Sequence, residues 1–178
     1  DTPEYETLKN YGDANLGIGY KSLHNITTGY YNNCLGYESG FNITSGKRNI
    51  FFGSQSGYSC TIGDNNLCLG LHAGSDITSG SQNTFIGVGT GLRITTGVHN
   101  VVIGYDGLYW HKLAKNNIVI GHEAMKSDQA GLDASGSDSN NGSFNIAIGN
   151  SCMKNVHTAS YNICIGENAA DYMYNGTY

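Results

Sequence analysis

The sequence repeats itself every 17 residues, and this period decides its fold class. An Asn stands four residues before a Gly at nine places: Asn15, Asn32, Asn49, Asn66, Asn83, Asn100, Asn117, Asn145 and Asn162. Successive Asn residues are 17 apart, except that 28 residues separate Asn117 from Asn145. Since 28 − 17 = 11, the chain holds nine repeats and one insertion of 11 residues. Such repeats stack on their neighbours, so the unit determines the architecture.

We number the Asn as position 1 and the residue before the next Asn as position 17. Position 5 is Gly in every repeat, and position 4 is always a large apolar residue. The first five repeats carry Ile-Thr-Thr-Gly, or a close variant of it, at positions 12 to 15. Repeats six to nine lose this cluster. The conserved positions therefore fall at short, regular intervals along each unit.

This pattern excludes helices, because Gly recurs every few residues and apolar residues do not keep the spacing of three and four residues that a helix needs. We predict one short strand from the Asn to the Gly, a second near Ile-Thr-Thr, and turns between them. Stacked units then form an all-β, parallel β-solenoid of nine coils of about 17 residues, roughly 43 Å long at the strand spacing of a sheet. The Asn column is expected to hydrogen-bond along its own ladder, and the Gly columns to form tight corners.

The strand is apolar on both faces, which predicts that both faces are buried. Alternation places positions 2 and 4 on one side and position 3 on the other. We expect positions 2, 4 and 12 to form the core and position 3 to face outward. Position 3 has no charged residue in any repeat: Gly17, Cys34, Phe51, Cys68, Phe85, Val102, Val119, Ala147 and Cys164. Exposing its large members would cost about 1.5–3 kcal/mol each. We therefore expect other copies of the chain to cover this stripe in a homotrimer, with a dimer as the alternative.

The composition indicates one domain and excludes several partners. We expect a lead-in or cap over residues 1–14, a solenoid over 15–178 and a C-terminal cap or tip over 167–178. A net charge of −5 offers no basic stripe for nucleic acid, and no apolar stretch is long enough for membrane insertion. The five cysteines show no disulfide framework, and we interpret Cys34 and Cys68 as small buried hydrophobes.

Nothing in the repeat predicts catalysis. The six histidines fall at six different repeat positions, and neither His nor Asp forms a column. We therefore expect no catalytic residues, no metal, no cofactor and no enzymatic activity. Paired threonines such as Thr27 and Thr28 raise the possibility of ice binding. However, Thr alternates there with Ser and Ile, so packing in turns and strands is the favoured explanation.

Three departures from the repeat are candidate ligand-binding sites, because solenoids bind where units deviate. In repeat 6, Tyr109, Trp110 and His111 offer rings and polar tips that suit a sugar; alternatively, Leu108 and Trp110 fill an enlarged corner. The second departure is the insertion within 125–144, which is either a loop that contacts a receptor or an insertion that the fold tolerates without a function. The third is the C-terminal tail, which either caps the open end of the solenoid or presents a tip, and the cap is favoured. The candidate residues in these two are Asp133, Asp138, Asn140, Tyr172 and Tyr174.

The unit Asn-x-x-Ile-Gly followed by Ile-Thr-Thr/Ser-Gly resembles the repeats of trimeric fibre proteins over residues 15–166. These include phage and viral tail fibres and the β-roll heads of trimeric autotransporter adhesins. The 17-residue period and the five cysteines depart from the autotransporter pattern. The resemblance implies an extracellular homotrimeric fibre, on a virion or a bacterial surface, that attaches to a host receptor, for which we expect a carbohydrate. The alternative is a purely structural shaft without a ligand.

Overall fold

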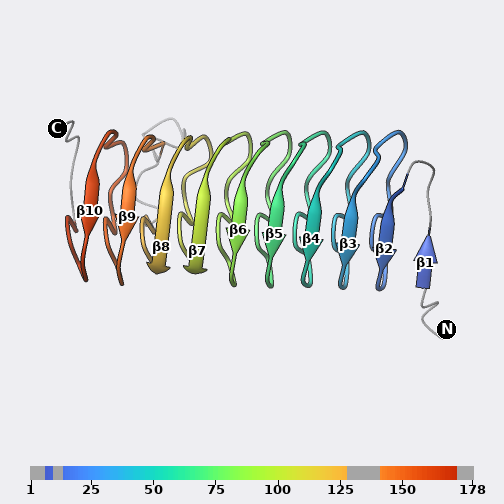
Figure 1. The fold of residues 1–178 in the computed structure, drawn as a ribbon, viewed down its shortest axis with the longest axis horizontal. Helices are drawn as coiled ribbons and strands as arrows, with labels where there is room; N and C mark the ends of the chain where they lie inside the picture. The colour runs from blue at the N-terminus through green and yellow to red at the C-terminus, as the bar shows by residue number, and fades with distance from the viewer. Residues whose placement is uncertain (1–6, 10–13, 128–140, 172–178) are drawn as a thin grey trace, which may run out of the picture.

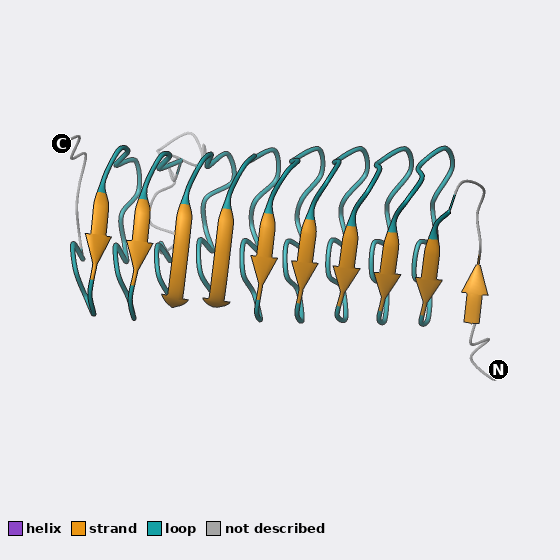
Figure 2. Ribbon diagram, in the orientation of Figure 1, coloured by secondary structure: helices purple, strands orange, loops and turns teal. Residues whose placement is uncertain are grey.

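The chain forms a rod of stacked coils in the computed structural model, which describes residues 7–9, 14–127 and 141–171 (Figure 1). Within these residues it consists of short strands and turns, with no helix (Figure 2). The strands are β1 (Thr7–Lys9), β2 (Leu16–Ile18), β3 (Asn33–Leu35), β4 (Ile50–Phe52), β5 (Leu67–Leu69), β6 (Thr84–Ile86), β7 (Val101–Tyr105), β8 (Ile118–His122), β9 (Ile146–Ile148) and β10 (Ile163–Ile165). Each of β2 to β10 begins at position 2, directly after the Asn of its repeat.

All strands belong to one sheet, in which they follow one another in chain order. Strands β2 to β10 pair in parallel and in register, so that Phe51 of β4 lies beside Cys68 of β5. Strand β1 pairs antiparallel with β2 and covers the first edge of the sheet. The prediction of an all-β parallel solenoid is therefore confirmed.

The predicted second strand, near Ile-Thr-Thr, is wrong. The backbone N–H groups of Thr27, Thr28 and Gly29 all donate to a single carbonyl, that of Thr44, at 2.9, 3.1 and 3.0 Å. Three successive donors can converge on one oxygen only where the chain bends, whereas an extended strand would spread them over several acceptors. This segment is a bend that is held against the next coil.

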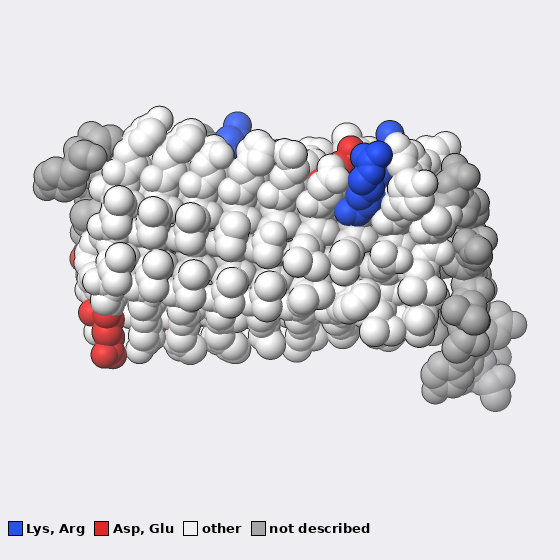
Figure 3. Space-filling view, viewed as in Figure 1, with Lys and Arg blue, Asp and Glu red and all other residues white. Residues whose placement is uncertain are grey.

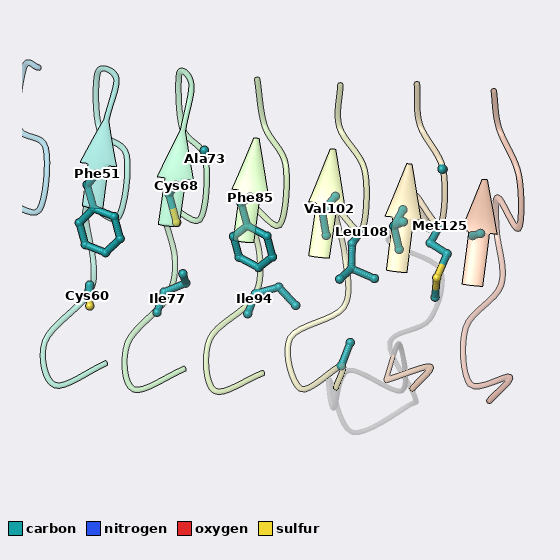
Figure 4. Packing of buried hydrophobic residues seen from close by; sticks show 14 of the residues in the cluster. Phe51, Cys60, Cys68, Ala73, Ile77, Phe85, Ile94, Val102, Leu108 and Met125 are labelled. Carbon is teal, nitrogen blue, oxygen red and sulfur yellow. The ribbon is translucent and has the colours of Figure 1, made fainter. Parts of the chain in front are cut away.

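The two faces of the strand are the reverse of the prediction. Position 3 points inward, and Phe51, Phe85 and Val102 are fully buried in the core (Figure 4). Positions 2 and 4 point outward, where Ile50 is 36% and Phe52 is 40% exposed. Position 12 is inside as expected, because Ile43, Ile77 and Ile94 are fully buried. The strand orientation was predicted wrongly because alternation separates the two faces of a strand but does not say which of two apolar faces is inside.

Core volume is divided between positions 3 and 9 of each repeat. Gly57 at position 9 lies against the ring of Phe51, and a Cβ at Gly57 would overlap that ring. In repeat 6 position 3 is the smaller Val102 and position 9 is the larger Leu108, and both are fully buried. The repeats with Cys34 and Cys68 keep Gly at position 9, and a Cβ at Gly40 or Gly74 would closely approach the Phe ring of the following coil. Because interiors are close-packed, core volume is therefore shared both within a coil and between adjacent coils.

The Asn ladder is confirmed and uses the full hydrogen-bonding capacity of each amide. Asn49 Oδ1 accepts from the backbone N–H of Asn66 at 3.0 Å and from its Nδ2 at 3.1 Å. Asn49 Nδ2 donates to Asn32 Oδ1 at 3.0 Å and to the carbonyl of Gly63 at 2.8 Å. Two donors and two lone pairs are thereby satisfied, which a buried amide requires.

The Gly at position 5 is a corner, as predicted. Gly36 has a φ of 137°, in the region that favours glycine, and a Cβ there would lie 2.5 Å from the carbonyl oxygen of Gly53. A side chain at this position would therefore push two stacked coils apart. This close approach explains the Gly of the first eight repeats, and Gly166 of the last one shares the positive φ.

Candidate functional site

The structure describes three of the eight residues that were predicted to bind a ligand. Tyr109 and Trp110, at positions 10 and 11 of repeat 6, are half-buried, and His111 at position 12 is fully buried. The other five lie outside the described residues: Asp133, Asp138, Asn140, Tyr172 and Tyr174.

Trp110 is already engaged within the chain. The guanidinium of Arg93 lies over its ring, 4.6 Å from the ring centre, and Arg93 Nη1 is 2.9 Å from Asp76 Oδ2. These three residues occupy position 11 in successive repeats. One face of the indole therefore carries a cation that is itself paired, which leaves that face closed to a sugar.

His111 belongs to the core rather than to a surface site. It takes the place of the Ile at position 12, directly before the repeat in which the insertion interrupts that column. The hydroxyl of Ser127 donates to the carbonyl of Val156 at 2.8 Å and lies 3.1 Å from His111 Nε2. Since the hydroxyl has one proton, it accepts from the His111 Nε2–H. His111, Ser127 and Val156 thus join repeats 6, 7 and 8 across the interruption.

A charged network runs along the same three repeats. Lys126 Nζ lies 2.9 Å from Asp106 Oδ2 and 2.8 Å from Glu123 Oε1, and Lys154 Nζ lies 2.6 Å from Glu123 Oε2. Hydrogen bonds from Lys126 and Lys154 lower the pKa of Glu123 to about 2. This carboxylate is ionised at neutral pH and holds no proton to give, so it links coils and does not act as a general acid.

The cysteines are free and unreactive in character. Cys34, Cys60 and Cys68 are buried, and burial raises the pKa of each thiol, that of Cys60 to about 12. A thiol that stays protonated is a poor nucleophile. The interpretation of Cys34 and Cys68 as small buried hydrophobes is confirmed. In the described part of the chain, no three His, Cys, Asp or Glu side chains are grouped so that they could hold a metal.

The threonine column makes internal contacts. The hydroxyl of Thr44 donates to the carbonyl of Thr61 at 3.1 Å, and that of Thr61 donates to the carbonyl of Thr78 at 3.1 Å. The same bond recurs from Thr27, Thr78 and Thr95. Each of these hydroxyls therefore donates its proton to a carbonyl of the next coil, which supports packing between coils rather than ice binding as the role of these threonines.

A continuous apolar feature of the surface is the outer face of the strands, formed by positions 2, 4 and 6, which we call the strand face. Its exposed members include Leu35 (42%), Ile103 (38%) and Ile120 (37%). No repeat has a charged residue at positions 2 to 5, and Glu167 is the single one at position 6. Figure 3 shows this face, with Lys, Arg, Asp and Glu confined to its margins.

A second surface feature is a small basic patch at the corner between positions 16 and 17, which we call the basic corner. It consists of Tyr30, Tyr31, Lys47, Arg48 and Asn65. Lys47 Nζ lies 5.1 Å and the Arg48 guanidinium carbon 5.5 Å from the centre of the Tyr30 ring. Tyr31 meets Tyr30 edge-on at 5.2 Å and is 53% exposed. Sequence analysis missed this patch, although Lys47 and Arg48 are the one pair of adjacent cations in the sequence.

Comparison of the chain with protein-family models, with curated proteins and with solved structures finds no match. Among the described residues, no helix is long and apolar enough to cross a membrane.

Proposed function

We propose that this chain is a segment of a homotrimeric extracellular fibre that attaches a virus, phage or bacterium to a host cell surface through glycans. The observation that carries the proposal is the strand face, an apolar surface without central charges that follows the rod from β2 to β10. Isolated apolar residues are common on surfaces, but a continuous patch of this kind marks an interaction site.

The pitch of the strand face favours other copies of the same chain as its cover. Parallel, in-register pairing sets equivalent side chains one strand spacing apart, about 4.8 Å, along the whole rod. Another copy presents the same ladder at the same spacing, so contacts that fit in one repeat fit in all. A partner without this period would match only a short stretch of the face.

The size of the face agrees with such an assembly. The face is nine strands long, about 43 Å, and five residues wide, about 13 Å, so its area is about 560 Å² on each copy. This lies at the upper end of the largest patches on monomeric proteins. Two such faces together bury about 1,100 Å², which passes the size expected of a biological interface. Three copies around one axis cover all three faces, and the resemblance to trimeric fibres favours that number over two.

Attachment follows from the shape of such an assembly. A rigid rod of three parallel chains repeats any surface site three times at fixed separations. Binding several receptors at once converts weak single contacts into useful avidity without any new contact. Cell-surface glycans are the receptors that suit this mode, because they are dense and individually weak.

A structural shaft without a ligand is the second candidate. It is favoured by the internal use of side chains that would otherwise be available for binding. The Asn and Thr ladders are satisfied between coils, and Trp110 is covered by Arg93. In this case the chain would hold a separate tip away from the particle.

The solution mass tests the assembly. Light scattering should give three times the mass of one chain for the unaltered protein and one chain for Leu35→Lys/Ile103→Lys, with β-structure kept by circular dichroism. Gln82→Lys, on an exposed position outside the strand face, is the matched control and should stay trimeric. A folded single chain as the unaltered species would contradict the proposal.

Glycan-array binding and attachment to host cells test the function. The adhesive fibre predicts retention of labelled trimer by a glycan or a cell, and loss of retention in the single-chain variant as avidity falls. A trimer that binds neither glycans nor cells supports the shaft instead.

A further inference from the structure

We infer that the basic corner binds an acidic sugar, one that carries a carboxylate or a sulfate, and this inference rests on the proposed attachment to glycans. The patch lies at the corners of repeats 1, 2 and 3, away from the predicted site around Trp110. Two cations, two tyrosines and an amide meet there within three stacked coils.

The two cations form no ion pair in the part of the chain that the structure describes. Arg93, Lys126 and Lys154 each pair with a carboxylate. In contrast, neither Lys47 nor Arg48 forms an ion pair with a described residue, and Arg48 is exposed. A protein of net charge −5 thus keeps, at one corner, two adjacent positive groups that no described carboxylate pairs with, and an anion can neutralise them there.

A neighbouring carboxylate, that of Asp64, is already engaged. Asp64 Oδ1 accepts the backbone N–H of Lys47 at 2.7 Å and lies on the coil beyond it. Counting Lys47, Arg48 and Asp64, the formal local charge is +2 − 1 = +1. The corner therefore remains positive, and the bond to Asp64 fixes the backbone from which Lys47 extends.

Tyr30 holds the cations in place before a ligand arrives. Both groups lie within 5.5 Å of the centre of its ring, so their side chains lose less freedom on binding than free surface lysines and arginines would. Backbone hydrogen bonds connect the three corners: the Arg48 N–H donates to the Tyr30 carbonyl at 3.0 Å, and the Asn65 N–H donates to the Lys47 carbonyl at 2.9 Å. The patch is thus preorganised by the same stacking that builds the rod.

The remaining side chains suit the neutral part of a sugar. Tyr31 offers an exposed ring and hydroxyl, and Asn65 offers an exposed amide. A ring packs against the apolar face of a sugar, and an amide can both donate to and accept from its hydroxyls. An anion alone would need only the cations, whereas this combination fits an anion that is attached to a sugar.

Binding of three oligosaccharides to the assembled protein tests the inference: a sialylated one, its neutral desialylated parent, and a heparin-derived sulfated one. We expect binding of the sialylated or the sulfated probe, weakened by added salt, and no binding of the neutral parent. Lys47→Gln/Arg48→Gln should weaken it about tenfold or more, since bonds to charged groups are lost. The matched control is Lys115→Gln, an exposed lysine at the same repeat position as Lys47, which should bind as the unaltered protein does.

The outcomes separate the two proposals. Which probe binds distinguishes a carboxylate from a sulfate ligand, and either result supports the inference. Binding of the neutral parent, or equal binding by Lys47→Gln/Arg48→Gln, overturns the inference and leaves the proposed attachment standing. A lower solution mass for that variant also overturns it, because the corner would then be a contact between copies. Absence of any glycan or cell binding by the trimer overturns both.

Discussion

Repeats 1 to 5 and repeats 6 to 8 share one backbone but fill and fasten it differently. The first five have the Ile-Thr-Thr/Ser-Gly cluster, with threonine hydroxyls bonded from coil to coil. The later ones lack it and have instead the network around Glu123, the polar link from His111 to Val156, and large residues at position 9, where repeats 2 to 5 have Gly and only repeat 1 among the first five has a large residue, Leu23. The strand and the Asn ladder persist through both regions. So does the bond from each Asn amide to the carbonyl at position 15, which belongs to Ala114, Gly142 and Ala159 in repeats 6, 7 and 8.

The difference shows which contacts specify the coil. The Asn amide and the backbone bonds are the same in both regions, so they set the path of the chain. The core residues and the outer charged residues vary, so they stabilise a path that is already fixed. Substitutions in the two regions test this division.

Loss of the Asn ladder should have the largest effect, and the effect should be equal in both regions. Asn32→Ala and Asn117→Ala each remove four hydrogen bonds and strand buried partners, which should lower the free energy of unfolding by about 3–4 kcal/mol. Urea denaturation measures this. Asn33→Ala, beside the ladder and partly exposed, is the control and should change little. A much smaller loss for Asn117 would show that the later repeats are held by other contacts.

Exchange of the two core patterns should have the next largest effect. Gly57→Leu places a side chain against the Phe51 ring and should cost about 2–3 kcal/mol. Phe51→Val/Gly57→Leu copies the pair in repeat 6 and should recover most of that loss, as read from the same urea curves. A double variant no more stable than Gly57→Leu would argue against the sharing of core volume.

Acid should weaken the later region selectively. The folded-state pKa of Glu123 is lowered to about 2 from 4.5, so its contribution is present above pH 4.5 and is lost as the pH falls towards 2. Glu123→Gln should therefore be less stable than the unaltered protein at pH 7, and the difference should vanish near pH 2. Thermal unfolding across this range measures it, and the partial exposure of the network keeps the effect modest. A difference that does not change with pH would contradict the assignment to charge.

The threonine ladder should contribute least per residue. Thr78→Val keeps the shape of the side chain but removes the bond to the Thr95 carbonyl, with an expected cost of about 0.5–1 kcal/mol. Thr96→Val, exposed at position 14 and without such a bond in the described structure, is the control. Equal unfolding midpoints for the two variants would show that the ladder adds no stability.

The period alone predicted most of the fold. Nine Asn residues gave the register, the parallel pairing and the amide ladder, and Gly at position 5 gave the corners. The orientation of the strand was predicted wrongly, because alternation does not distinguish inside from outside when both faces are apolar. A signal was present in the sequence: the two Phe residues at position 3 stand in repeats with Gly at position 9, as Phe51 does with Gly57, whereas the smaller Val102 stands with Leu108. Only residues that share one interior compensate in this way.

The candidate site was less predictable than the fold. His111 falls at position 12, which was itself predicted to point inward, so its burial followed from the repeat register. The engagement of Trp110 by Arg93 and the stacking of Lys47 and Arg48 on Tyr30 join residues 17 or 18 apart. Such contacts depend on how far each side chain reaches towards the adjacent coil, which a repeat pattern does not encode.

The packing of Phe51 against glycines of two coils constrains the order of the repeats. A Cβ at Gly57 of its own coil would overlap the Phe51 ring, and a Cβ at Gly40 of the preceding coil would lie 3.3 Å from it. Recombination that moves or deletes one unit therefore also changes the interior of a neighbour, so the succession of units along the rod is constrained by its core.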